Sequence, residues 1–80
     1  MGRYTVLLIP DTEDGGYVVK VPALPGCVTQ GDTREEAVEN AKDVIEVWIE
    51  AALAAGETVP AEVLPPELVA VAVQVPSVAP

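Results

Sequence analysis

The sequence has no histidine, a single cysteine, Cys27, and four basic residues against thirteen acidic ones in a chain of 80 residues. Without histidine the chain cannot form the Ser/His or Cys/His pairs of nucleophilic enzymes, and a lone cysteine cannot form an intrachain disulfide. The metal ligands that remain are carboxylates. We therefore expect a protein that is not an enzyme, with no metal or other cofactor and a packed, unreactive Cys27.

The net charge is strongly negative, -9 at pH 7. Nucleic-acid binding depends on lysine and arginine neutralising phosphates, so direct binding to DNA or RNA is not expected. A negative surface favours encounter with a basic protein instead. The first apolar run, residues 4–9, ends at Pro10 and is too short to span a membrane. We expect no signal peptide, no membrane anchor and a cytoplasmic location.

The length suits one domain, residues 1–80, in which four strands are predicted. Apolar alternation and intervening turn formers place the strands at about 3–9, 17–22, 27–31 and 68–75. The turn from Pro10 to Gly16 joins the first two as a hairpin. Valine alternates with smaller or polar residues in the last strand, and residues 76–80 are expected to form a tail.

A long helix is predicted at about residues 34–55. Thr33 can cap its first turn while Glu36 reaches back to the Thr33 backbone, and Gly56 follows its last turn. Apolar residues recur between them at intervals of three and four and form one face: Ala37, Val38, Ala41, Val44, Ile45, Trp48, Ile49, Ala52 and Leu53. On the opposite side lies an acidic stripe, which is the candidate surface for a basic partner: Glu39, Asp43, Glu46 and Glu50.

This order of elements predicts an α+β fold of β-β-β-α-β type in two layers, with one mainly antiparallel sheet and a single long helix packed on one face. One helix covers only one face of the sheet. The other face, with Leu7, Ile9 and Val18, is expected to remain an exposed apolar patch, a feature that commonly marks an interface. We therefore expect a homo-oligomer, either a dimer or a tetramer.

The acidic turn of the hairpin, Asp11-Thr12-Glu13-Asp14-Gly15, is similar to part of a calcium-binding loop. However, the twelfth position, which needs a bidentate glutamate, is Pro22. We interpret the segment as a solvated turn. A carboxylate-and-metal nuclease that uses Asp11 or Asp14 is the alternative from the enzyme class.

An ordered set of residues resembles the signature of HicB-like antitoxins, Y-x-x-x-x-P-x-L-P-G-C followed by G-x-T-x-E-E-A. The matching residues are Tyr17, Pro22, Leu24, Pro25, Gly26, Cys27, Gly31, Thr33, Glu35, Glu36 and Ala37. The resemblance covers about residues 4–60. We interpret these residues as mainly structural, because they shape the crossover to the third strand, cap the helix and let the helix approach the sheet.

The resemblance implies a fold like a partial ribonuclease H domain and a role as antitoxin to a small basic toxin of the HicA type. Such toxins cleave messenger RNA with a histidine, and the antitoxin covers that active site. Related antitoxins often carry a C-terminal DNA-binding module, and none is expected here. Two alternatives stay open: an orphan homo-oligomeric scaffold of the same family, and the metal-dependent nuclease.

Overall fold

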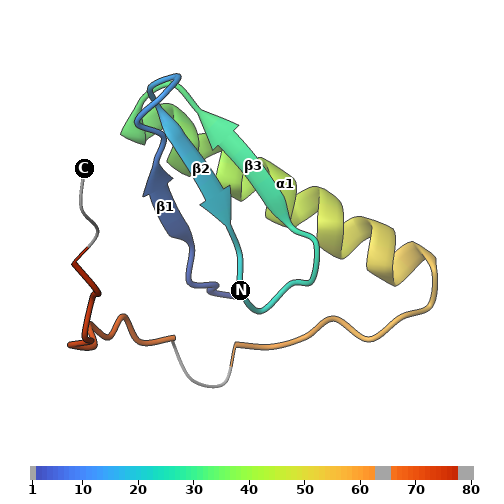
Figure 1. The fold of residues 1–80 in the computed structure, drawn as a ribbon. Helices are drawn as coiled ribbons and strands as arrows, with labels where there is room; N and C mark the ends of the chain where they lie inside the picture. Colours follow the sequence, from blue (N-terminus) through green and yellow to red (C-terminus); the bar gives the residue numbers. More distant parts are fainter. Residues whose placement is uncertain (1, 63–65, 78–80) are drawn as a thin grey trace.

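The computed structural model describes residues 2–62 and 66–77, which contain three strands and one long helix. The strands are β1 (Leu7–Pro10), β2 (Tyr17–Lys20) and β3 (Val28–Gly31). They form an antiparallel sheet in the order β1-β2-β3, and the helix α1 (Arg34–Ala54) lies across one of its faces (Figure 1). The predicted α+β arrangement, antiparallel strands followed by one long helix, is confirmed. The likeness to a partial ribonuclease H domain stays a prediction.

The register of the sheet decides which residues face the helix. Leu8 lies opposite Val19 and Ile9 lies opposite Val18 in the β1–β2 pair. Because side chains alternate across a strand, Leu8 and Val19 share the helix-facing side of the sheet. Val19 is completely buried there against Ala37 of α1. The opposite side therefore carries Ile9 and Val18.

The core consists of two small clusters under the helix. The first is formed by Val19, Ala37 and Ala41, with Val6, Leu8 and Tyr17 packed around it. The second is formed by Val21, Leu24 and Cys27, with Tyr4, Val6, Val44, Ile45 and Trp48 packed around it. Both clusters are built mainly from aliphatic side chains, as expected from a sequence in which 4% of residues are aromatic.

Hydrogen bonds at both ends fix the limits of α1. The Thr33 side chain accepts a hydrogen bond from the Glu36 backbone N–H at 3.0 Å. The Glu36 carboxylate accepts from the backbone N–H of Asp32 at 3.2 Å, one residue before the position that the capping-box prediction gave. At the other end, the N–H of Glu57 donates to the carbonyl of Ala52, which satisfies a carbonyl left open by the end of the helix.

The helix approaches the sheet most closely at β3. A Cβ atom added to Gly31 would lie 2.6 Å from the Cα of Ala37 and in contact with the Ala37 nitrogen. Real Cβ atoms do not approach backbone atoms so closely. The absence of a side chain at Gly31 and the small side chain of Ala37 therefore let α1 pack mainly against β3, and to a lesser extent against β2.

The segment after α1 returns to the start of β1. The Tyr4 hydroxyl donates to the carbonyl of Pro60 at 2.7 Å. The backbone N–H and the hydroxyl of Thr5 donate to the two carboxylate oxygens of Glu62, at 2.7 and 2.6 Å. These three bonds hold the connector across the N-terminal end of β1.

The prediction of a fourth strand at 68–75 is wrong for the single chain. Residues 66–77, which we call the C-terminal arm, have no strand pairing and lie apart from the sheet (Figure 1). A strand forms only where a neighbouring strand accepts its backbone hydrogen bonds, so strand propensity is insufficient without a partner. Of the predicted tail, 76–80, residues 78–80 lie outside the described residues.

Candidate partner-binding surface

The acidic stripe lies on the side of α1 that faces away from the sheet. All four of its carboxylate side chains are exposed: Glu39, Asp43, Glu46 and Glu50. Ala37, Ala41 and Ala52 are the buried residues of the same helix. At about 100° per residue, the stripe lies opposite these alanines, so a partner can reach all four carboxylates without displacing the sheet.

Two residues of the predicted apolar helix face are more exposed than the periodicity indicated: Val38 is 45% exposed and Leu53 is 62% exposed. Val47, which the prediction did not place on that face, is 63% exposed beside the stripe. The sheet is too narrow to cover the whole apolar arc, and its strands end before the last turns of α1 (Figure 1). The outer side of the helix therefore combines carboxylates with exposed aliphatic side chains.

The proline-glycine part of the signature forms a compact loop after β2. The N–H of Val21 donates to the carbonyl of Cys27, and the N–H of Cys27 donates to the carbonyl of Leu24. Gly26 has a φ of 75°, a left-handed conformation that favours glycine. Leu24 is 1% exposed at the centre of the second core cluster.

Trp48 ties this loop to the helix. Its indole Nε1–H donates to the carbonyl of Pro25 at 3.0 Å, while the ring packs against the second core cluster. The periodicity placed Trp48 on the apolar face but did not identify this hydrogen bond. A partly buried tryptophan usually finds an acceptor for its indole N–H. The sequence could therefore have indicated that Trp48 has a hydrogen-bond partner, but not that the partner is Pro25.

The remaining signature residues divide between the core and the surface. Cys27, Gly31 and Ala37 are buried, and Tyr17 is half-buried against the first core cluster. The exposed ones are Pro22, Pro25, Gly26, Thr33, Glu35 and Glu36. The structure thus gives several of them contacts that shape the fold, and it gathers Pro22, Pro25 and Gly26 on the surface of one loop.

The sheet face opposite α1 is partly apolar. Ile9 is 42% exposed and Val28 is 50% exposed, while Leu7 and Val18 are half-buried. A shallow hollow at one end of this face is lined by Leu7, Val28 and the loop after β2. The expected apolar patch is therefore present, and it is a second surface that a protein partner could contact.

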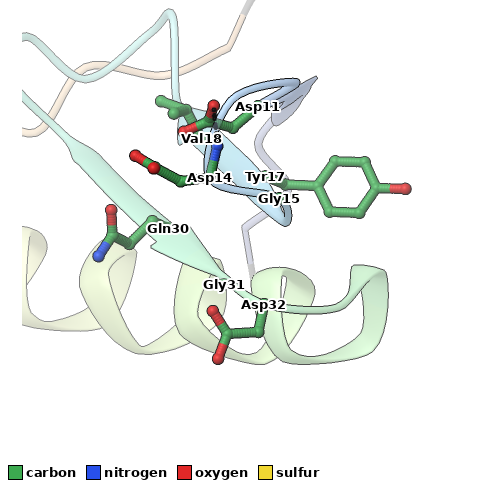
Figure 2. A pocket seen from close by; sticks show the side chains of 8 residues that line it. All are labelled: Asp11, Asp14, Gly15, Tyr17, Val18, Gln30, Gly31 and Asp32. Atoms are coloured by element: carbon green, nitrogen blue, oxygen red, sulfur yellow. Dashed lines mark hydrogen bonds between the residues drawn. The ribbon is translucent and has the colours of Figure 1, made fainter.

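A second hollow lies between the hairpin turn and the end of β3, where Asp11, Asp14 and Asp32 meet the solvent (Figure 2). Asp11 accepts hydrogen bonds from the N–H groups of Glu13 and Asp14, at 3.0 and 3.1 Å, so its carboxylate holds the turn. The side chains of Asp14 and Asp32 point in different directions (Figure 2). Within residues 2–62 and 66–77, no three metal-ligating side chains gather to hold an ion.

A groove between β1 and α1 was not identified from the sequence. Because α1 packs mainly over β3, the helix-facing side of β1 is only partly covered. The lining of this β1–α1 groove includes Val6, Leu8, Arg34, Val38, Lys42 and Ile45. No local pattern could have indicated it, since the groove depends on which strand the helix covers.

Burial raises the pKa of the Cys27 thiol above its ordinary value. The thiol therefore stays protonated at neutral pH, and a protonated thiol is a poor nucleophile. As the pH rises, the thiol of the unfolded chain loses its proton first, because the pKa of Cys27 is lower in the unfolded chain than in the folded one. Stability is thus expected to fall as the pH rises above about 8.5, the pKa of an unperturbed thiol.

We expect a thiol reagent to label Cys27 in the native protein at least about 100-fold more slowly than in denaturant, because labelling requires both exposure and ionisation. The measurement is the absorbance of the released chromophore at about pH 8. The unfolded protein in denaturant is the control for full reactivity. Equal rates for the folded and unfolded chains would contradict a buried Cys27.

Along the described parts of the chain, no helix combines the length and the apolar character that crossing a bilayer requires.

Comparison with known proteins identifies the family. Residues 4–76 match the family described as the HicB-like antitoxin of bacterial toxin-antitoxin systems. A UPF0150 protein of Thermoplasma acidophilum is 52% identical over 58 residues, which is 72% of this chain and 83% of the relative. A UPF0150 protein of Synechocystis is 48% identical over 60 residues, 75% of each chain. Antitoxin HicB 1 of Photorhabdus laumondii is 56% identical over 43 residues, 54% of this chain but 27% of that protein. The chain therefore belongs to the HicB-like antitoxin family.

Proposed function

We propose that this chain binds and neutralises a small basic toxin of the HicA type that cleaves messenger RNA, and that it does so by covering the active site of the toxin. Membership of the antitoxin family implies a toxin partner. The observation that carries the finer proposal is the acidic stripe, four carboxylates exposed along one side of α1.

The geometry of the stripe suits a basic protein surface. From Glu39 to Glu50 it extends about 16 Å along the helix axis, at a rise of about 1.5 Å per residue. A standard interface of about 800 Å² per partner is roughly 30 Å across, so the stripe would cover about half of its width. Complementary charge mainly accelerates encounter and fixes orientation, while apolar anchors supply much of the affinity. Val47 and Leu53 provide exposed aliphatic groups on the same helix.

Neutralisation of this kind requires no chemistry from the antitoxin. A nuclease is silenced when a tightly bound protein excludes RNA from its catalytic residues, and a negative surface also repels the phosphate backbone. The net charge of -9 favours both the binding of a basic toxin and the repulsion of RNA. Arg3, Lys20, Arg34 and Lys42 are the four basic residues of the chain, and none belongs to the stripe.

The direct test is titration of a purified HicA-type toxin with this chain while RNA cleavage is measured. We expect cleavage to stop at a stoichiometric amount of antitoxin, binding to weaken as salt is raised, and co-expression to restore the growth of cells that produce the toxin. Persistent cleavage in the presence of excess antitoxin would contradict the proposal. The chain alone, incubated with RNA and magnesium, is the control, and cleavage there would favour the nuclease alternative.

A further inference from the structure

The C-terminal arm exposes an unusual amount of apolar surface. The exposed fractions of its large side chains range from 70% to 89%: Leu68, Val69, Val71, Val73 and Val75. The valines recur at every second position, with Ala70, Ala72 and Gln74 between them. In an extended chain this alternation places all four valines on one side. Such a segment is typical of a strand whose valine side is buried.

The dimensions of the single chain also indicate a missing partner. Its accessible surface is 6575 Å², whereas a compact protein of 8.3 kDa is expected to expose about 4,600 Å². Its radius of gyration is 16.3 Å, against about 12 Å for a compact domain of this length. The excess surface is about 2,000 Å² per chain, or about 4,000 Å² for two chains, which lies within the total of roughly 2,000–5,000 Å² that obligate homodimers bury.

The same chain offers a place where such a strand fits. Among the residues that the structure describes, β1 is an edge strand, because β2 pairs with it on one side and no described strand pairs with it on the other. The N–H of Asp11 donates to the carbonyl of Gly16, so these two residues form a hydrogen-bonded pair of the β1–β2 ladder. Hydrogen-bonded and non-hydrogen-bonded pairs alternate along an antiparallel ladder. Leu8, three residues before Asp11, is therefore in a non-hydrogen-bonded pair, and its N–H and C=O point toward the open edge. Residues 4–10 contain no charged residue that would block pairing at this edge. The β1–α1 groove lies beside the edge and presents Val6, Leu8 and Val38.

Charge favours contact between two copies at this place over contact elsewhere. Residues 4–10 and 68–80 contain no aspartate, glutamate, lysine or arginine. Pairing the arm with β1 therefore brings no carboxylates together, although each chain carries a net charge of -9. Contact through the acidic stripes of two copies would instead oppose like charges. The groove also contains Arg34 and Lys42, whose aliphatic stems can cover apolar side chains.

We propose that the C-terminal arm of one copy adds as a fourth strand to the open edge of β1 in a second copy, and that the exchange is reciprocal. The arm's valines then fill the partner's β1–α1 groove, and Ala70 and Ala72 lie on the opposite side of the enlarged sheet. The exchange makes the protein a dimer and pairs the open backbone groups of both edges. This inference does not depend on the identity of any toxin.

The first test compares the mass of the full chain in solution with that of an arm variant. Light scattering coupled to size exclusion is expected to give a dimer for the native chain. The double substitution Val71→Asp and Val73→Asp is expected to raise the dissociation constant at least about 100-fold, because two buried valines become charged. The control, Gln74→Asp with Ser77→Asp, adds the same charge outside the valine set and is expected to stay dimeric.

The second test distinguishes exchange from other modes of association. Val38→Asp changes the groove but leaves the arm intact, and its site is 45% exposed, so the fold should tolerate it. Neither this variant nor the arm variant is expected to dimerise alone. When the two are mixed, an intact arm meets an intact groove and a heterodimer is expected. A monomeric native chain, an arm variant with the native mass, or a mixture without heterodimer would each overturn the proposal.

Discussion

Replacing Gly31 by alanine is expected to lower the free energy of unfolding by about 3 kcal/mol, the upper part of the range for overpacked sites. The added methyl group would lie 2.6 Å from the Cα of Ala37 and 2.9 Å from the carbonyl carbon of Glu36. Both are backbone atoms of α1, so no side-chain rotation relieves the clash and the helix must move off β3. Urea denaturation followed by circular dichroism measures the loss.

Gly15→Ala is the matched control for this substitution. Gly15 has a φ of 78°, so alanine is strained there, but an added Cβ would meet nothing within 4 Å. The expected cost is about 1 kcal/mol, from backbone strain alone. If Gly31→Ala costs no more than Gly15→Ala, then the close approach of α1 to β3 is not what makes glycine necessary at position 31.

Neutralising the acidic stripe is expected to weaken toxin binding by about 10- to 100-fold, since exposed charge pairs contribute about 0.2–1 kcal/mol each. The variant carries Glu39→Gln, Asp43→Asn, Glu46→Gln and Glu50→Gln. Most of the loss should appear in the association rate, and the salt dependence of binding should become shallower. Surface plasmon resonance at several salt concentrations against a HicA-type toxin measures both quantities.

A control with the same change of charge separates a local contact from the overall field. It carries Glu13→Gln, Asp14→Asn, Glu57→Gln and Glu67→Gln, all at exposed positions outside the stripe. We expect a smaller loss, because long-range steering weakens but the docking surface remains. The stripe variant should be as stable as the native protein, since it removes like charges four residues apart. Equal losses in both variants would argue against a docking role for the stripe.

The local elements of this fold could be predicted from short-range patterns. The limits of α1 follow from Thr33 and Glu36 at one end and Gly56 at the other, because capping depends on residues a few positions apart. The hairpin follows from alternating aliphatic residues around a turn that the Asp11 carboxylate stabilises. The exposure of the stripe follows from helical periodicity. Each of these features involves neighbours within about one or two helical turns, whose geometry is nearly fixed.

The predictions that failed, and the contact that was missed, all required knowledge of what lies next to a segment in space. Residues 68–75 have the pattern of a strand, yet pairing needs an edge, and in the single chain the arm does not occupy one. Leu53 follows the apolar period of α1 but projects beyond the short sheet, so it is 62% exposed. The hydrogen bond from Trp48 to Pro25 joins residues 23 positions apart.

The sequence by itself determined the charge, the absence of histidine chemistry, the helix with its two faces, and the order of strands before it. These depend on composition and on interactions between residues close along the chain. The tertiary structure alone decided that α1 covers β3 and leaves β1 open, because this depends on the close contact of Gly31 with Ala37. It also decided that the valine-rich arm pairs with no strand of its own chain. The alternation of valines gives the arm the propensity of a strand, but pairing depends on where the fold leaves an open edge relative to the arm.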